Sequence, residues 1–169
     1  DDWKAANITN DRVKCNKVDK VVANEGNCAY MFRGSVGENA KLTQKNKDVA
    51  ELTAGSTLNV VLFYRTSNVQ PTVQVRLTVY YDDATTTKLD SVINTVSSEY
   101  TPFNVARYLV ENGKTVTKIR LQIQNRSTDG KVFIDSPAVN AFASPTVSIS
   151  PPELKPLLAA PVIAPIAVP

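Results

Sequence analysis

The sequence predicts an all-β domain folded as an antiparallel β-sandwich, and three observations predict it. Apolar and polar residues alternate along residues 72–81 and 117–125, which is typical of strands with one buried face. Val and Thr recur throughout the chain, and long runs with helical spacing are hard to find. Turn residues separate about eight to ten short candidate strands, a spacing that favours a sandwich.

The candidate strands follow one another at short intervals. Residues 58–64 are expected to be a fully buried strand, because residues 60–63 contain no polar break. Residues 42–52 are ambiguous, since residues 48–52 could also form a helical turn. Asn-Gly at 112–113 and Asp-Gly at 129–130 favour tight hairpin turns. The other expected strands are residues 18–22, 29–32, 40–44, 88–94, 100–110 and 131–134.

Composition excludes several classes of function. The chain has no His, which removes the commonest general base and metal ligand. Its net charge of +3 is too small to indicate a nucleic-acid partner. Carboxylates such as Asp82, Asp83, Asp90 and Glu99 could form an acid and base pair, but Asp82 and Asp83 occupy a turn signal where Asp is favoured for backbone reasons. We therefore expect no enzyme activity, no catalytic residues and no cofactor.

The two cysteines point to an oxidising compartment. Cys15 and Cys28 enclose twelve residues with a turn signal at 24–27, and a disulfide closing such a loop is expected to stabilise the fold by about 3 kcal/mol. Two free, buried thiols are the alternative. The chain starts at Asp1 without a Met or an apolar leader, which fits a secreted or cell-surface product after signal removal or an artificial start. Sequons at Asn7 and Asn125 permit N-glycosylation.

The composition changes near residue 144, so we expect a sandwich domain over residues 1–143 and an extended tail over 144–169. Residues 156–169 are fourteen apolar residues in a row, too few for a transmembrane helix and interrupted by proline. Pro161, Pro165 and Pro169 all have odd numbers. Their missing N–H groups fall on one flank of an extended strand, and the even residues keep a full row of hydrogen-bonding groups on the other.

Such a tail can pair along one edge of a sheet and cannot template a further strand beyond it. A disordered, proline-rich linker is the alternative interpretation. The residues expected to contact a neighbouring subunit are Leu157, Leu158, Ala160, Val162, Ile163, Ala164, Ile166 and Val168.

Three segments carry a resemblance to a known family. Residues 11–16 (DRVKCN), 26–34 (GNCAYMFRG) and 37–44 (GENAKLTQ) resemble the start of jelly-roll, carbohydrate-binding-module-like domains of secreted microbial surface proteins, and residues 130–135 (GKVFID) are similar to their closing strand. The resemblance covers residues 1–143 and implies a jelly-roll sandwich. It also implies a structural calcium held by an acidic pair in the last strand, but here Asp135 is followed by Ser136 and Pro137. The family's opening strand precedes its first Trp, whereas Trp3 lies almost at the start of this chain.

If the domain binds a glycan, the outward faces of the two alternating strands are the place to look. Their polar side chains can form hydrogen bonds with sugar hydroxyls, although the same side chains could simply form a solvated face. The candidate residues are Gln74, Arg76, Tyr80, Arg120, Gln122 and Gln124.

Two functions follow from these observations. The first is an extracellular structural subunit that forms a head-to-tail homopolymer, a filament or a surface layer, when the tail of one copy adds a strand to the next. The alternative is a carbohydrate-binding module of a secreted enzyme or cell-wall protein, with a polysaccharide as its partner. A third possibility is that the tail packs onto its own domain.

Overall fold

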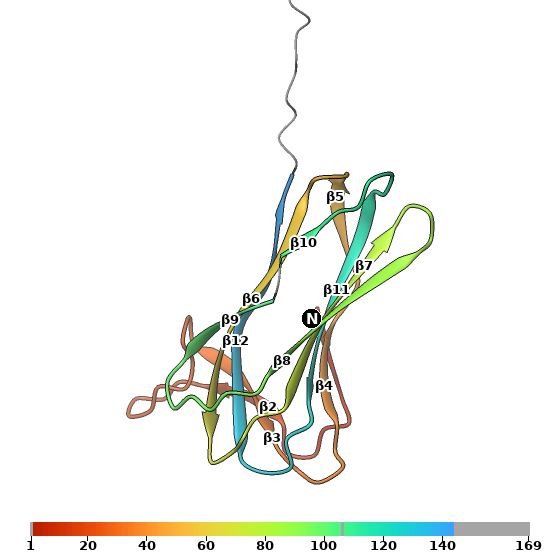
Figure 1. Cartoon of the computed structure of the whole chain (residues 1–169). Helices are drawn as coiled ribbons and strands as arrows, with labels where there is room; N and C mark the ends of the chain where they lie inside the picture. Colours follow the sequence, from red (N-terminus) through yellow and green to blue (C-terminus); the bar gives the residue numbers. More distant parts are fainter. Residues whose placement is uncertain (1, 106, 144–169) are drawn as a thin grey trace, which may run out of the picture.

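The computed structural model describes residues 2–105 and 107–143, and these residues form a sandwich of two antiparallel sheets (Figure 1). This confirms the expected all-β, jelly-roll-like fold. The expected tail strand lies outside the described residues. Sheet A contains β1 (Trp3–Ala6), β4 (Ala40–Gln44), β5 (Lys47–Leu52), β7 (Val73–Tyr81), β8 (Thr86–Ile93) and β11 (Val116–Asn125). Sheet B contains β2 (Arg12–Cys15), β3 (Cys28–Arg33), β6 (Thr57–Ser67), β9 (Thr101–Asn104), β10 (Tyr108–Leu109) and β12 (Lys131–Phe142).

The chain crosses repeatedly between the two sheets. The strand order is β1-β4-β11-β7-β8 in sheet A and β10-β6-β12-β3-β2 in sheet B. β5 continues along β11 beyond β4, and β9 pairs with β6 beside β10. Strands distant in sequence are therefore neighbours in space, and β7 with β11 forms the centre of sheet A.

The inward faces of the two sheets supply the core. In sheet A, Val75 lies opposite Ile123 and Leu77 lies opposite Leu121, and all four side chains are buried. The apolar residues that alternate along β7 and β11 in the sequence therefore face the core. Sheet B contributes large, fully buried side chains from β3, β6 and β12, among them Phe32, Leu58, Leu62 and Ile134.

Several expected elements differ from the structure. Residues 18–22 form no strand, because residues 18 and 19 are a tight turn bridged by Lys17 and Lys20, and Val18 at its tip is fully exposed. Residues 48–52 belong to β5 rather than to a helical turn. The single strand expected over residues 100–110 is divided into β9 and β10.

The two Gly-containing turn signals do not form hairpins. The pair at 112–113 connects β10 of sheet B with β11 of sheet A, and the pair at 129–130 connects β11 with β12 of sheet B. Gly113 and Gly130 do adopt positive φ angles of 76° and 63°. The expectation of hairpins is wrong at both positions, because the strands on either side of each pair belong to different sheets.

The predicted disulfide is confirmed. Cys15 and Cys28 lie directly opposite each other in β2 and β3, and their sulfur atoms are bonded. The bond closes residues 16–27 into a loop at the edge of sheet B. In the described part of the chain, no helix has the length and apolar character needed to cross a membrane.

Candidate functional site

The six residues proposed from the sequence lie together on the outer face of sheet A. The register places Gln74 opposite Gln124 and Arg76 opposite Gln122 across β7 and β11. Tyr80 and Arg120 extend the same face toward the other end of the two strands. We call these six residues the polar face.

A row of polar contacts crosses the polar face from β8 to β4. Arg76 Nε and Nη2 donate to Asp90 Oδ1 and Oδ2 at 2.6 and 2.7 Å, a bidentate ion pair. Gln122, the cross-strand neighbour of Arg76, donates from Nε2 to Thr43 Oγ1 at 3.2 Å. The hydrogen bond with Arg76 is the main cause that lowers the pKa of Asp90, and the same bond raises the pKa of Arg76. The row is thus held in a fixed geometry before any ligand binds.

Arg126 joins a second pair of side chains on this face. Its Nη2 donates to Gln74 Oε1 at 3.1 Å and to Gln124 Oε1 at 3.4 Å. Gln74 also forms a side-chain hydrogen bond with Asp90, and Gln124 is buried. Arg126 therefore holds both glutamines within the hydrogen-bond network of this face.

Arg120 and Tyr80 form the part of the face with unused hydrogen-bonding capacity. The guanidinium carbon of Arg120 lies 5.8 Å from the centre of the Tyr80 ring, within the range of a cation–π contact. Arg120 Nε is buried and has no hydrogen-bond partner among the described residues. A buried donor without an acceptor costs free energy, but Arg120 Nε has almost no solvent exposure and is not an atom that a ligand can reach. Tyr80 and the rest of the Arg120 side chain are half-buried and can contact a ligand.

Sequence reasoning missed the residues that organise the polar face. Asp90, Thr43 and Arg126 come from β8, β4 and the loop after β11, and they fix three of the six predicted side chains and contact a fourth. A sequence alone does not say which strands flank β7 and β11. The alternation of β8, in which Lys88 and Asp90 share one parity, was the only available signal.

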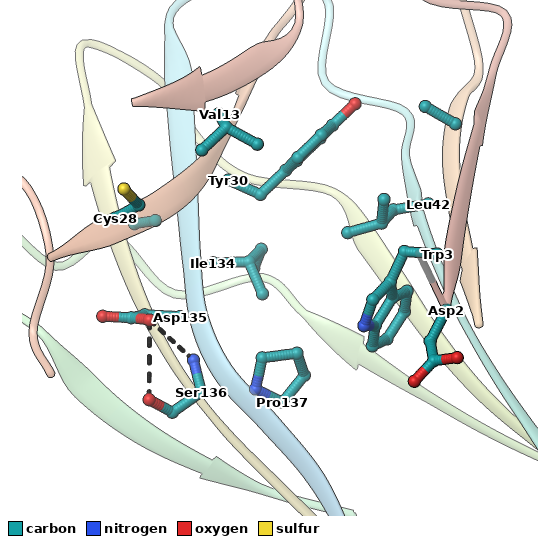
Figure 2. Close-up of a pocket in the computed structure, with 12 residues that line it drawn as sticks. Asp2, Trp3, Val13, Cys28, Tyr30, Leu42, Ile134, Asp135, Ser136 and Pro137 are labelled. Carbon is teal, nitrogen blue, oxygen red and sulfur yellow. Dashed lines mark hydrogen bonds between the residues drawn. The ribbon is translucent and has the colours of Figure 1, made fainter. Parts of the chain in front are cut away.

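A cavity of about 430 Å³ opens at the opposite edge of the sandwich, where β1 of sheet A faces β12 of sheet B. Figure 2 shows Trp3 and Leu42 on one side of it and Ile134 and Pro137 on the other, with Tyr30 above them. Its lining is mostly apolar, and Trp3 is the only Trp of the chain. The cavity could not be predicted from the sequence, because neither β1 nor the end of β12 shows the pattern of a strand.

Asp135 at the rim of this cavity is fully occupied by backbone amides. Its Oδ2 accepts from Asn24 N and Glu25 N at 2.6 and 3.0 Å, and its Oδ1 accepts from Ser136 N at 2.8 Å. The residues here do not fit the structural calcium that the resemblance implies, because three N–H dipoles point their positive ends at the carboxylate where a cation would sit. No group of three or more potential metal ligands occurs in residues 2–105 and 107–143.

The carboxylates of Asp11, just before β2, and Glu38, just before β4, lie near the buried hydroxyl of Tyr30. Asp11 Oδ1 accepts a hydrogen bond from the Arg33 N–H, while Asp11 Oδ2 and Glu38 Oε1 are buried without a partner among the described residues. Burial raises the pKa of Asp11, and the negative charge of Glu38 adds to this. Burial, together with both charges, raises the pKa of Tyr30 to about 12, so its hydroxyl is neutral at physiological pH.

Asp11→Asn is expected to raise the free energy of unfolding at neutral pH. Asn retains an oxygen for the Arg33 N–H but carries no charge that must be buried. The pKa of the Asp11 carboxyl is higher in the folded chain than in the unfolded chain, so the folded chain binds the carboxyl proton more firmly. The contribution of Asp11 to stability is therefore lost as the pH rises from the unfolded-state pKa through the folded-state pKa. Urea unfolding from acid to neutral pH measures the difference. It should grow with pH and then level off, and a pH-independent difference would contradict the assignment.

The two sequons occupy different environments. Asn7 is exposed just after β1, whereas Asn125 is buried at the end of β11, where its Oδ1 accepts a hydrogen bond from Ser127 N at 3.2 Å. Glycosylation stays a prediction at both positions, and Asn7 is the accessible one.

Solved structures share this fold at low sequence identity. A cyclase from Fischerella sp. TAU superposes with a TM-score of 0.66 at 13% identity, covering 86% of this chain and 86% of that one. TmCBM61 in complex with β-1,4-galactotriose gives 0.54 at 17%, covering 82% and 87%. The CBM22-1 xylan-binding domain from Paenibacillus barcinonensis Xyn10C gives 0.50 at 8%, covering 84% and 86%. No protein-family model and no curated protein matches the sequence.

The same fold also occurs as part of larger proteins. In the bacteriophage CBA120 tailspike protein 4, the match has a TM-score of 0.61 at 10% identity and covers 83% of this chain but 19% of that one. The neighbours include a cyclase, a tailspike domain and carbohydrate-binding modules, so the fold does not specify one function. In its fold, the described domain is a carbohydrate-binding-module-like jelly roll.

Proposed function

We propose that the domain binds a polysaccharide along the polar face of sheet A and catalyses no reaction. The observation that carries the proposal is the fixed row formed by Asp90, Arg76, Gln122 and Thr43, beside the cation–π pair of Arg120 and Tyr80. Neighbouring strands lie about 5 Å apart, so this face offers hydrogen-bonding groups at regular intervals across four strands. An extended polysaccharide, which carries hydroxyl groups along its length, matches such a surface.

The charges of the polar face favour binding over catalysis. Asp90 is ion-paired with Arg76, and Asp48 at its margin lies 3.6 Å from Lys118 Nζ. A glycosidase needs one carboxylic acid that stays protonated near neutral pH. The pKa of Asp90 is instead lowered by Arg76. Tyr80 supplies an aromatic ring for contact with a sugar.

The neighbours indicate which polysaccharides to try first. TmCBM61 was solved with β-1,4-galactotriose, and the Paenibacillus domain is described as xylan-binding. The likeness extends to the fold alone, so both glycans are starting points for a wider panel. A secreted or cell-surface location agrees with the Cys15–Cys28 disulfide.

Tyr80→Ala and Arg120→Ala are expected to weaken polysaccharide binding at least about fivefold each, because each removes a contact worth about 1 kcal/mol or more. Affinity gel electrophoresis with soluble xylan, β-1,4-galactan and other plant and microbial polysaccharides measures the effect. Arg12→Ala is the matched control, since Arg12 is an exposed arginine on β2 of sheet B. The proposal is wrong if no polysaccharide slows the protein, or if Arg12→Ala has the same effect as Arg120→Ala.

Self-assembly by tail addition remains a second proposal, which the comparisons do not support. Its donor segment, residues 156–169, lies outside the described residues. One observation favours it, namely a sheet edge that can receive a strand. That edge is independent of the polar face.

A further inference from the structure

β12 is paired on both flanks for only part of its length. β6 accompanies it from Lys131 to Phe142, whereas β3 pairs with it only from Lys131 to Ile134. A bulge follows Asp135, where Ser136 has a φ of 46°. Beyond the bulge, in residues 138–142, the flank of β12 that faces away from β6 pairs with no strand of the described chain. We call this flank the open edge (Figure 1).

The interior of the sandwich is uncovered beside the open edge. Ala141 lies directly opposite Leu58 in β6, so both side chains are on the same, inward face of sheet B. Leu58 is fully buried, whereas Ala141 is exposed. An inward-facing position that remains exposed means that no element covers this corner within the described domain.

The open edge lacks the features that normally protect an edge strand. Natural edges carry charged residues, especially Lys, or are covered by other elements. Residues 138–142 contain no charge, and Phe142 is 52% exposed. Such an edge favours pairing with another strand.

The cavity between β1 and β12 continues the apolar surface at the lower end of the open edge. Ser136 and Pro137 line this cavity and directly precede the first residue of the open edge. Trp3 and Leu42 from sheet A face it from the other side (Figure 2). Apolar side chains of an added strand would therefore find a cavity of about 430 Å³ at one end of the edge.

We propose that the open edge receives residues 156–169 of a second copy of this chain as an added β-strand. The sequence of that segment matches an edge of this kind. Pro161, Pro165 and Pro169 leave one flank of the strand without three donors, while every even residue from Ala160 to Val168 keeps its N–H and C=O for the other flank. Neither the edge nor the segment carries a charge, and strand addition of this type draws its affinity from main-chain hydrogen bonds.

A second copy fits better than the chain's own tail. Phe142, where β12 ends, forms the end of the open edge, so the same tail would have to reverse direction within residues 143–155 to return along it. Residues 143–155 contain Pro145, Pro151 and Pro152, and proline favours an extended backbone over a compact reversal of the chain. Contacts of one tail with the next domain do not close on themselves, and they extend into a filament.

The donor segment is tested by adding one proline at either of two positions, on opposite flanks of the proposed strand. Ala164→Pro removes an N–H from the pairing flank, whereas Ala167→Pro removes one from the flank that already contains the prolines, and both variants lose the same side chain. In sedimentation velocity over a wide concentration range, the full chain should associate, and Ala164→Pro should weaken association at least about tenfold. Ala167→Pro should associate like the unmodified chain. Equal effects of the two prolines, or a monomer at every concentration, would overturn the proposal.

The acceptor side is tested with a charge on either face of β12. Ala141→Lys places an ammonium group on the inward face of the open edge and should weaken association at least about tenfold. Asn140→Lys is the control on the outer face, because Asn140 is the exposed neighbour with the opposite parity. Thermal unfolding establishes that both variants fold. If Asn140→Lys and Ala141→Lys associate equally well, the open edge is not the acceptor. Both arms leave the polar face unchanged, so polysaccharide binding should be unaffected.

Discussion

Gly130→Ala is expected to destabilise the domain by about 4 kcal/mol, through backbone strain of about 1–2 kcal/mol and overpacking of about 1–3 kcal/mol. Gly130 has a φ of 63° in the connection from sheet A to sheet B, and a Cβ there would overlap the backbone oxygen of Asn68 and the Cβ of Val69. The connection cannot move away easily, because the Gly130 carbonyl accepts a hydrogen bond from Gly34 N at 3.1 Å. Urea unfolding monitored by fluorescence or circular dichroism measures the loss.

Gly113→Ala separates the two causes. Gly113 has a similar φ of 76°, but no atom lies within contact distance of a Cβ built there. Only the backbone term applies, so the expected loss is about 1 kcal/mol. If the two variants lose the same free energy, the close packing of Gly130 against residues 68–69 contributes nothing, and the larger expected loss is wrong.

The sequence predicted most reliably where one strand face is buried over a long distance. β7 and β11 each alternate over nine or more residues, so a shift by one residue would turn the whole apolar set toward solvent. The same alternation placed Gln74, Arg76, Gln122 and Gln124 on one face before their partners were known. The two strands then proved to be direct neighbours, which is why the polar face could be proposed from residue parity alone.

The edges of the sandwich could not be predicted in this way. β1 and β2 have four residues each and bury little of their surface, so their sequences show no alternation. β12 changes register at its bulge, which interrupts the period of two after Ile134. Residues 18–22, in contrast, contain the valines typical of a strand, but Val18 and Val21 are exposed and only Val22 is buried. The open edge and its cavity are formed by these short or irregular elements and appear only in the folded chain.

Polar partners across strands also depend on topology. From the sequence alone, Asp90 could be either an ion-pair partner of Arg76 or a member of a catalytic pair. The choice requires knowing that β8 lies beside β7. The same holds for Asp135, which in the sequence looked like half of a calcium-binding pair. In the folded chain its partners are backbone amides more than a hundred residues away, in the loop closed by the disulfide.

Asp135→Ala is expected to destabilise the domain by about 3 kcal/mol, because the amides of Asn24, Glu25 and Ser136 lose a charged acceptor. The Asp135 side chain is buried, so the contact of the loop with the bulge of β12 depends on it. Asp135→Asn keeps one oxygen acceptor and should lose less. Urea unfolding gives the free energies, and amide hydrogen exchange of Asn24 and Glu25 reports on the loop itself.

The Cys15–Cys28 disulfide keeps the loop attached when Asp135 is removed, so the loss should be local at first. Exchange of the Asn24 and Glu25 amides should rise strongly in Asp135→Ala, while amides in β7 and β11 should change only as far as global stability falls. Asp19→Ala is the control, an exposed carboxylate with no hydrogen bond or ion pair to the described residues, and should stay within about 0.5 kcal/mol of the unmodified domain. Unchanged exchange at Asn24 and Glu25 in Asp135→Ala would show that the loop is held by the disulfide alone, and that the carboxylate does not fix the bulge from which the open edge begins.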